Sequence, residues 1–101
     1  YPAPFAARYQ ELLPRRLDRI STALGSAEHA DLDAALEASL SLKVASTTVG
    51  ARELEELAGV IELSVRRHDV AAARSLADAL PYAGRRADRA LATYLAERHA
   101  G

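Results

Sequence analysis

Three histidines are the side chains of this 101-residue chain best suited to carry a chemical step. An imidazole can transfer a proton, bind a metal or accept a phosphoryl group. His29, His68 and His99 lie far apart in the sequence, and their spacing matches no common metal site. The chain has no cysteine, which excludes disulfides, thiolate metal sites and cysteine nucleophiles. We therefore expect neither a metal nor a cofactor.

Serine and aspartate side chains offer weaker chemical candidates. Ser39, Ser41 and Ser46 have no base close by in the sequence, and a serine nucleophile needs one. Asp31 and Asp33 could be paired carboxylates, but at a helix start they are better explained as a cap and a charge favoured by the helix dipole. No glycine-rich phosphate-binding loop is present. The sequence thus predicts a protein that is not an enzyme.

The composition favours a protein built only from helices. Ala, Leu, Arg and Glu dominate, and all four favour helix. Stretches rich in β-branched residues are few, so there is little material for a sheet. Half of the residues are hydrophobic but only 5% are aromatic, so the core must be aliphatic. A chain of this length suits one domain, which we expect to span residues 1–101.

The charge and hydropathy of the chain narrow the classes of partner. The net charge is -1, whereas nucleic-acid binders usually carry a strongly basic balance. No apolar run approaches the length of a membrane span, and no signal peptide is visible. The lack of cysteine fits a reducing interior. We expect a cytoplasmic protein whose partners include neither nucleic acid nor a membrane.

The elements that would position these side chains can be read from hydrophobic periodicity. Apolar residues recur at helical spacing over four segments, 4–24, 32–49, 51–67 and 70–99. Pro14 predicts a kink or break near Leu13 in the first segment, and Pro81 and Gly84 predict a bend in the last. Short loops between long helices favour antiparallel neighbours. The predicted fold is all-α, an antiparallel up-down four-helix bundle.

Capping residues mark the ends of these segments. Asp31 and Asp69 precede the second and fourth segments and are predicted N-caps. Gly50 follows the second segment, where a left-handed residue favours glycine. Gly25 and Ser26 close the first segment.

The second segment carries apolar residues on two opposite sides. At about 100° per residue, one narrow stripe suits a close-packed helix seam and consists of Ala35, Ala38, Leu42, Ala45 and Val49. The opposite side carries Leu36, Leu40, Lys43, Val44 and Thr47. An exposed leucine forgoes roughly 1.5–3 kcal/mol of burial. Either the first helix or a chain end covers this patch, or the patch docks a partner or a second copy of the chain.

The stretch Leu40–Ala51 resembles the signature of histidine phosphotransfer (HPt) domains, which reads roughly His-x-Leu-Lys-Gly-Ser-small-x-x-apolar-Gly-Ala. The direct matches are Leu42, Lys43, Val49, Gly50 and Ala51. The resemblance extends over most of the chain, from about Phe5 to Leu95. It implies an HPt-like bundle in a bacterial two-component phosphorelay, with a response-regulator receiver domain or a histidine kinase as partner.

Two departures from the HPt signature lie on the outer face of the second segment. Leu40 occupies the position of the phosphoacceptor histidine, and Val44 occupies that of a glycine which leaves room for the partner. Lys43 matches the lysine that helps to neutralise the phosphoryl group. An aliphatic side chain has no nucleophilic nitrogen. The resemblance therefore implies a pseudo-HPt domain that cannot carry phosphate and binds partners through Leu36, Leu40, Lys43, Val44 and Thr47.

Two alternatives remain open from the sequence. One is an active phosphotransfer protein that uses one of the three histidines, although none of them lies in mid-helix beside Lys43. The other is a structural helical dimerisation module with Leu36, Leu40 and Val44 as the contact between two copies.

Arginine gathers around the third loop and the last segment, at Arg66, Arg67, Arg74, Arg85, Arg86 and Arg89. The facing third segment carries Glu53, Glu55, Glu56 and Glu62. The main prediction is that these opposite charges pair with each other on the surface. The alternative is a site for phosphate or for an acidic partner.

Overall fold

The computed structural model describes residues 3–25 and 28–100, with the side chains of residues 4–25 and 28–97. This part of the chain forms α1 (Ala3–Leu24), α2 (Leu32–Val49), α3 (Arg52–Arg66), α4 (Val70–Ala77) and α5 (Leu80–Ala100). It contains no strand, so the prediction of an all-α fold is confirmed. None of the described helices is both long and apolar enough to cross a lipid bilayer.

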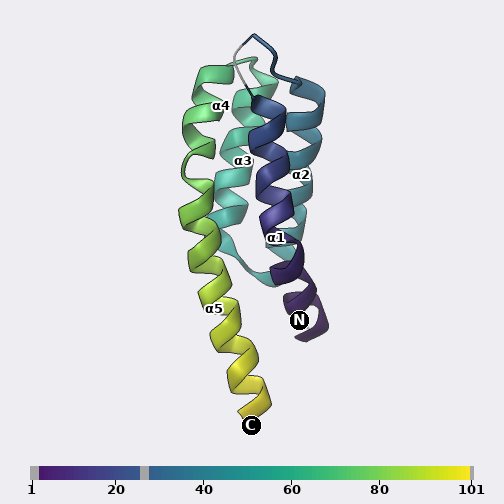
Figure 1. The fold of residues 1–101 in the computed structure, drawn as a ribbon, viewed down its shortest axis with the longest axis vertical. Coiled ribbons are helices and arrows are strands. Elements are labelled where there is room, and N and C mark those ends of the chain that lie inside the picture. Colours follow the sequence, from purple (N-terminus) through teal and green to yellow (C-terminus); the bar gives the residue numbers. More distant parts are fainter. Residues whose placement is uncertain (1–2, 26–27, 101) are drawn as a thin grey trace.

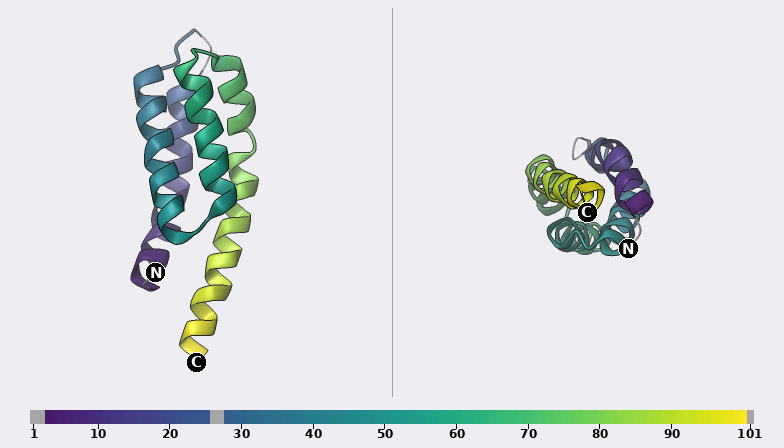
Figure 2. Two further views of the ribbon diagram at one scale, coloured as in Figure 1. Left: turned by 180° about the vertical axis from the view of Figure 1, so that it is seen from behind. Right: turned by 90° about the horizontal axis from the view of Figure 1, so that it is seen from below.

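α1, α2 and α3 run side by side and alternate in direction along an elongated molecule, and α4 and α5 follow one another in the same direction along its remaining side (Figure 1). α2 packs against α1 on one side and α3 on the other. α4 and α5 each pack against both α1 and α3, so the helices surround a common core, as the end-on view in Figure 2 shows. α5 continues past the ends of the other helices (Figure 1), and the longest dimension reaches 51 Å.

An aliphatic core holds the helices together. Its largest fully buried apolar side chains are Ile20, Leu24, Leu42, Leu54, Ile61 and Leu80. On α2, the predicted seam residues Ala35, Ala38, Leu42 and Val49 are buried, whereas Ala45 is half-buried at the edge of the seam. Small side chains on this seam allow α1 and α3 to approach α2 closely.

α1 runs through Pro14 without interruption, so the predicted break near Leu13 does not occur. A proline inside a helix removes one backbone hydrogen bond. The inner face of α1 compensates, because Tyr9, Leu13 and Ile20 are buried on both sides of the proline.

The predicted last segment is two helices rather than one bent helix. Asp78 and the residue after it separate α4 from α5. Pro81 lies in the first turn of α5, where the missing N–H is not needed. Gly84 lies inside α5 and serves the packing of α1 and α5, since a Cβ there would lie 2.6 Å from Cδ1 of Leu17.

The predicted helix caps are confirmed. The carboxylate of Asp31 accepts a hydrogen bond from the backbone N–H of Ala34, and Asp69 does the same for Ala72. Gly50 ends α2 with a left-handed φ of 74°. Ser26, which was expected to help close the first helix, lies outside the described residues.

Candidate functional site

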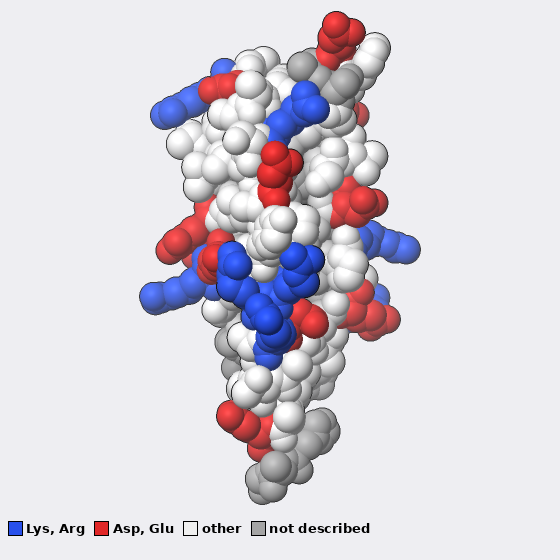
Figure 3. Space-filling model, turned by 60° about the vertical axis from the view of Figure 1, so that its left-hand side comes forward, with Lys and Arg blue, Asp and Glu red and all other residues white. Residues whose placement is uncertain are grey.

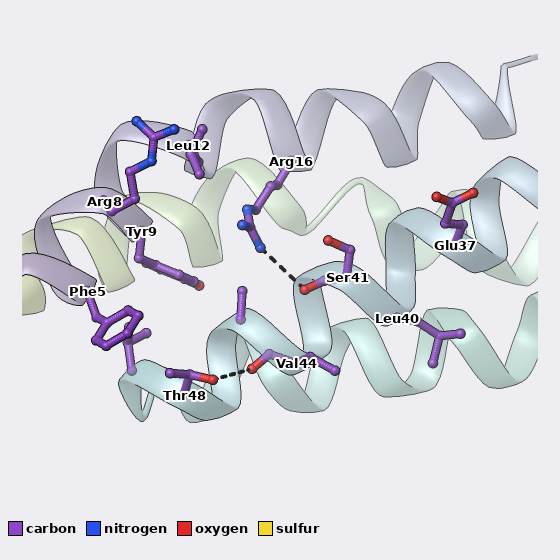
Figure 4. A pocket seen from close by; sticks show the side chains of 12 residues that line it. Phe5, Arg8, Tyr9, Leu12, Arg16, Glu37, Leu40, Ser41, Val44 and Thr48 are labelled. Carbon is purple, nitrogen blue, oxygen red and sulfur yellow. Dashed lines mark hydrogen bonds between the residues drawn. The ribbon is translucent and has the colours of Figure 1, made fainter.

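A groove of about 690 Å³ lies between α1 and α2 and is the strongest candidate for a binding site (Figure 4). From α1 it is lined by Phe5, Arg8, Tyr9, Leu12 and Arg16. From α2 it is lined by Glu37, Leu40, Ser41, Val44, Ala45, Thr48 and Val49. Its wall is mainly apolar, with charged side chains around the rim.

Two of the groove's apolar side chains are strongly exposed. Val44 is 65% exposed at the centre of the outer face of α2, and Phe5 is 59% exposed near the start of α1. Leu12 and Leu40, which also line the groove, are half-buried. α1 therefore covers part of the outer face of α2 but leaves Val44 open. Contiguous exposed apolar surface of this kind is typical of interaction sites.

The structure divides the predicted partner-binding residues between two faces. Leu40 and Val44 line the groove, whereas Leu36, Lys43 and Thr47 do not. Leu36 is half-buried and packs against the core, so it forms no single exposed patch with the other two apolar residues. Thr47 is exposed, and its hydroxyl donates to the carbonyl oxygen of Lys43.

Two buried serines show that the buried side of α2 is wider than the sequence predicts. Ser39 and Ser46 are fully buried and lie on the side of α2 that also carries Leu36. The buried side of α2 therefore extends beyond the predicted seam, towards Leu36. As a result, the middle of the exposed side lies close to Val44. Leu40 remains on the outer half of the helix but is not diametrically opposite the core.

Lys43 faces α3, where it takes part in an ion-pair network. Its Nζ donates to Oε1 of Glu62 at 3.2 Å, and Nε of Arg66 donates to Oε2 of the same carboxylate at 2.8 Å. The aliphatic part of the Lys43 side chain passes over Gly59, where a Cβ would still fit at 4.0 Å. The Glu62 side chain is only 13% exposed. Hydrogen bonds from Arg66 and Lys43 lower the pKa of Glu62 below its ordinary value of 4.5.

This network predicts an acid-sensitive contribution to stability. A carboxyl group with a lowered pKa in the folded state stabilises the fold fully above its unfolded pKa, near 4.5, and loses that contribution as the pH falls through the folded value. Denaturant unfolding of the parent and of Glu62→Gln should therefore show the parent more stable at neutral pH. The difference should shrink on acidification below pH 4.5. A difference that stays constant with pH would contradict this account.

The sequence did not single out the buried contact between Tyr9 and Ser46. The Tyr9 hydroxyl and Oγ of Ser46 lie 2.8 Å apart and join α1 to α2 beneath the groove. Burial raises the pKa of Tyr9 above its ordinary value of 10.0. Oγ of Ser39 donates to the carbonyl oxygen of Ala35. The helical spacing of Ser46 could have predicted its burial, because it lies between Leu42 and Val49 in the sequence and on the buried side of α2.

The histidines do not lie at the groove. His29 and His68 are exposed in the α1–α2 and α3–α4 loops, at the same end of the molecule (Figure 1). The side chain of His99 lies outside the described residues. Among the described residues, no group of three or more His, Asp or Glu side chains could hold a metal ion.

The predicted pairing of arginines with glutamates holds for two of them. Arg66 pairs with Glu62 on the same helix, and Arg86 of α5 pairs with Glu53 of α3. Arg85 lies over the ring of Tyr82, with 5.0 Å between its Cζ and the ring centroid.

Comparisons with known proteins give no relative from which function could be transferred. No protein-family model, curated protein or solved structure matches this chain. Function must be inferred from the groove and from the sequence resemblance of α2.

Proposed function

We propose that this chain is a partner-binding signalling module of the HPt type. Its fold would be the antiparallel up-down four-helix bundle of that family, with α4 and α5 together in the place of the fourth helix. The groove between α1 and α2 would dock a receiver domain or a histidine kinase of a two-component pathway in the cytoplasm. The observation that carries this proposal is Val44, an apolar side chain left 65% exposed on the outer face of α2.

The side chains at the HPt-like positions support docking without phosphate transfer. Leu40 offers no atom that could form a bond to phosphorus. Lys43 is engaged by the Glu62 carboxylate, so its charge is already balanced within the chain. His29 and His68 lie in loops outside the groove. The chain therefore keeps a surface on which a partner could dock at this position, but it has no side chain there that could accept phosphate.

The groove's composition fits a protein partner with an apolar contact and a charged rim. Phe5, Leu12 and Val44 supply apolar surface, and the rim holds Arg8 and Arg16 from α1. Interfaces commonly combine an apolar centre with a polar rim in this way. The guanidinium of Arg16 reaches across the groove to the carbonyl oxygen of Ser41, at 3.4 Å (Figure 4).

Incubation with phosphorylated receiver domains from the source organism's two-component pathways tests the proposal. The parent chain should acquire no phosphate but should bind one or more receivers. Val44→Asp should weaken that binding by roughly tenfold or more, because it places a charge in an apolar contact. Val60→Asp is the matched control, since Val60 is an exposed valine on α3, outside the groove. Stable phosphate on the parent chain would sink the proposal, as would equal effects of the two variants.

A gain of function tests the alignment itself. The double variant Leu40→His, Val44→Gly restores both residues of the HPt signature and should accept acid-labile phosphate from a receiver that binds the parent. Leu40→His alone should accept it more slowly, because Val44 crowds the approach. If binding is confirmed but the double variant never takes phosphate, the groove is a docking site unrelated to the HPt surface.

A further inference from the structure

A second charged surface lies on α5, away from the groove. Tyr82, Arg85, Arg86 and Arg89 recur at helical spacing, so they share one face of α5, and all are exposed. We call this set the arginine stripe. Figure 3 shows Lys and Arg side chains gathered around the middle of this side of the molecule. None of the four residues lines the groove between α1 and α2.

Two guanidinium groups of the arginine stripe are not neutralised within the described residues. Arg85 lies on the exposed ring of Tyr82, which holds its charge at the surface through a cation–π contact. Neither Arg85 nor Arg89 forms an ion pair with any described side chain. Asp88 lies beside them in sequence but points to α1, where it accepts a hydrogen bond from Nε2 of Gln10 at 3.1 Å.

Arg86 shows how this face receives a carboxylate. Its Nε and Nη2 donate to the two oxygens of Glu53 at 2.9 and 2.8 Å, a bidentate contact between half-exposed side chains. A guanidinium group can form this bidentate pair of hydrogen bonds with any carboxylate that approaches in its plane. Arg85 and Arg89 are one helical turn apart, about 6 Å along the axis. Their guanidinium groups offer two further pairs of N–H donors beside the pair of Arg86 that binds Glu53.

We propose that the arginine stripe binds an acidic segment of a partner protein, with carboxylates seated on Arg85 and Arg89. A short segment with a few carboxylates fits the space beside Glu53. A long phosphate polymer would also have to pass the Glu53 carboxylate, which repels it. This surface and the groove lie on different helices, so either can fail its test while the other stands.

Fluorescence anisotropy with a labelled oligoglutamate peptide, and with its oligoglutamine counterpart, tests this surface on the full chain at low salt. The glutamate peptide should bind and the glutamine peptide should not. The double variant Arg85→Gln, Arg89→Gln should weaken binding by roughly tenfold. The control is Arg15→Gln, Arg19→Gln, which removes the same charge at the same spacing from exposed positions of α1 and should leave the affinity within about twofold. Circular dichroism confirms that both variants remain helical.

Two results would overturn the proposal. Equal weakening by both double variants would mean that the peptide senses only overall charge. Tighter binding of a single-stranded oligonucleotide or an anionic vesicle, lost in Arg85→Gln, Arg89→Gln, would show that the surface serves another class of partner.

Loss of peptide binding in Tyr82→Ala would support the proposal for the arginine stripe, because the ring holds Arg85 in place.

Discussion

Leu42→Ala should lower the free energy of unfolding by about 2–5 kcal/mol, whereas Leu40→Ala, two positions earlier on the same helix, should cost less than about 1.5 kcal/mol. Leu42 is fully buried in the core, so its removal leaves a cavity there. Leu40 is half-buried at the edge of the groove, where solvent can fill the space it leaves.

Chemical denaturation of the two variants beside the parent measures this contrast. Both substitutions shorten the same side chain on the same helix, so helix propensity cancels from the comparison. The result also bears on the proposed function. If Leu40→Ala were as destabilising as Leu42→Ala, Leu40 would belong to the core and could not stand at the position of an exposed acceptor histidine.

Tyr9→Phe and Ser46→Ala should each lower the free energy of unfolding by about 1–3 kcal/mol, because each leaves the other hydroxyl buried without its partner. The double variant removes both polar groups. It should therefore be less destabilised than the sum of the two single variants. Denaturant unfolding of all four proteins forms a double-mutant cycle that isolates the coupling between the two hydroxyls. Additive effects would show that the contact between α1 and α2 contributes nothing beyond packing.

Alkaline pH provides a second readout for Tyr9. The pKa of Tyr9 is raised in the folded state, so the neutral phenol stabilises the fold fully below the unfolded pKa of 10.0. That contribution is lost as the pH rises above 10.0 towards the folded value. The parent should lose more stability over this range than Tyr9→Phe does. A parallel loss in both proteins would mean that the phenol is not held neutral by burial.

The Tyr9–Ser46 contact also links stability to the groove. Tyr9 lines the groove floor, and its hydroxyl fixes α1 relative to α2. The apolar surface formed by Phe5, Leu12 and Val44 keeps its shape only while these two helices keep their spacing. Val44 itself adds little to the core, since it is 65% exposed. Val44→Asp should thus perturb binding with little effect on stability, whereas Tyr9→Phe should perturb stability and the shape of the groove together.

The sequence by itself determined the local features of this protein. The caps at Asp31 and Asp69 and the left-handed Gly50 depend on hydrogen bonds and backbone angles within one helical turn. The buried seam through Leu42 and Val49 follows from a period of 3.6 residues, which any amphipathic helix obeys. The same reasoning placed Val44 on the outer face, because that position is far from the seam.

Only the tertiary structure decided which outer positions remain open. Leu36 packs on the core and Lys43 pairs with Glu62, because α3 lies against that side of α2. Ser46 is buried because Tyr9 of α1 supplies a partner for its hydroxyl. These outcomes depend on side chains far away in the sequence, and a helical wheel describes one helix without its neighbours. The exposure of a functional surface is therefore set by what packs beside it, not by periodicity alone.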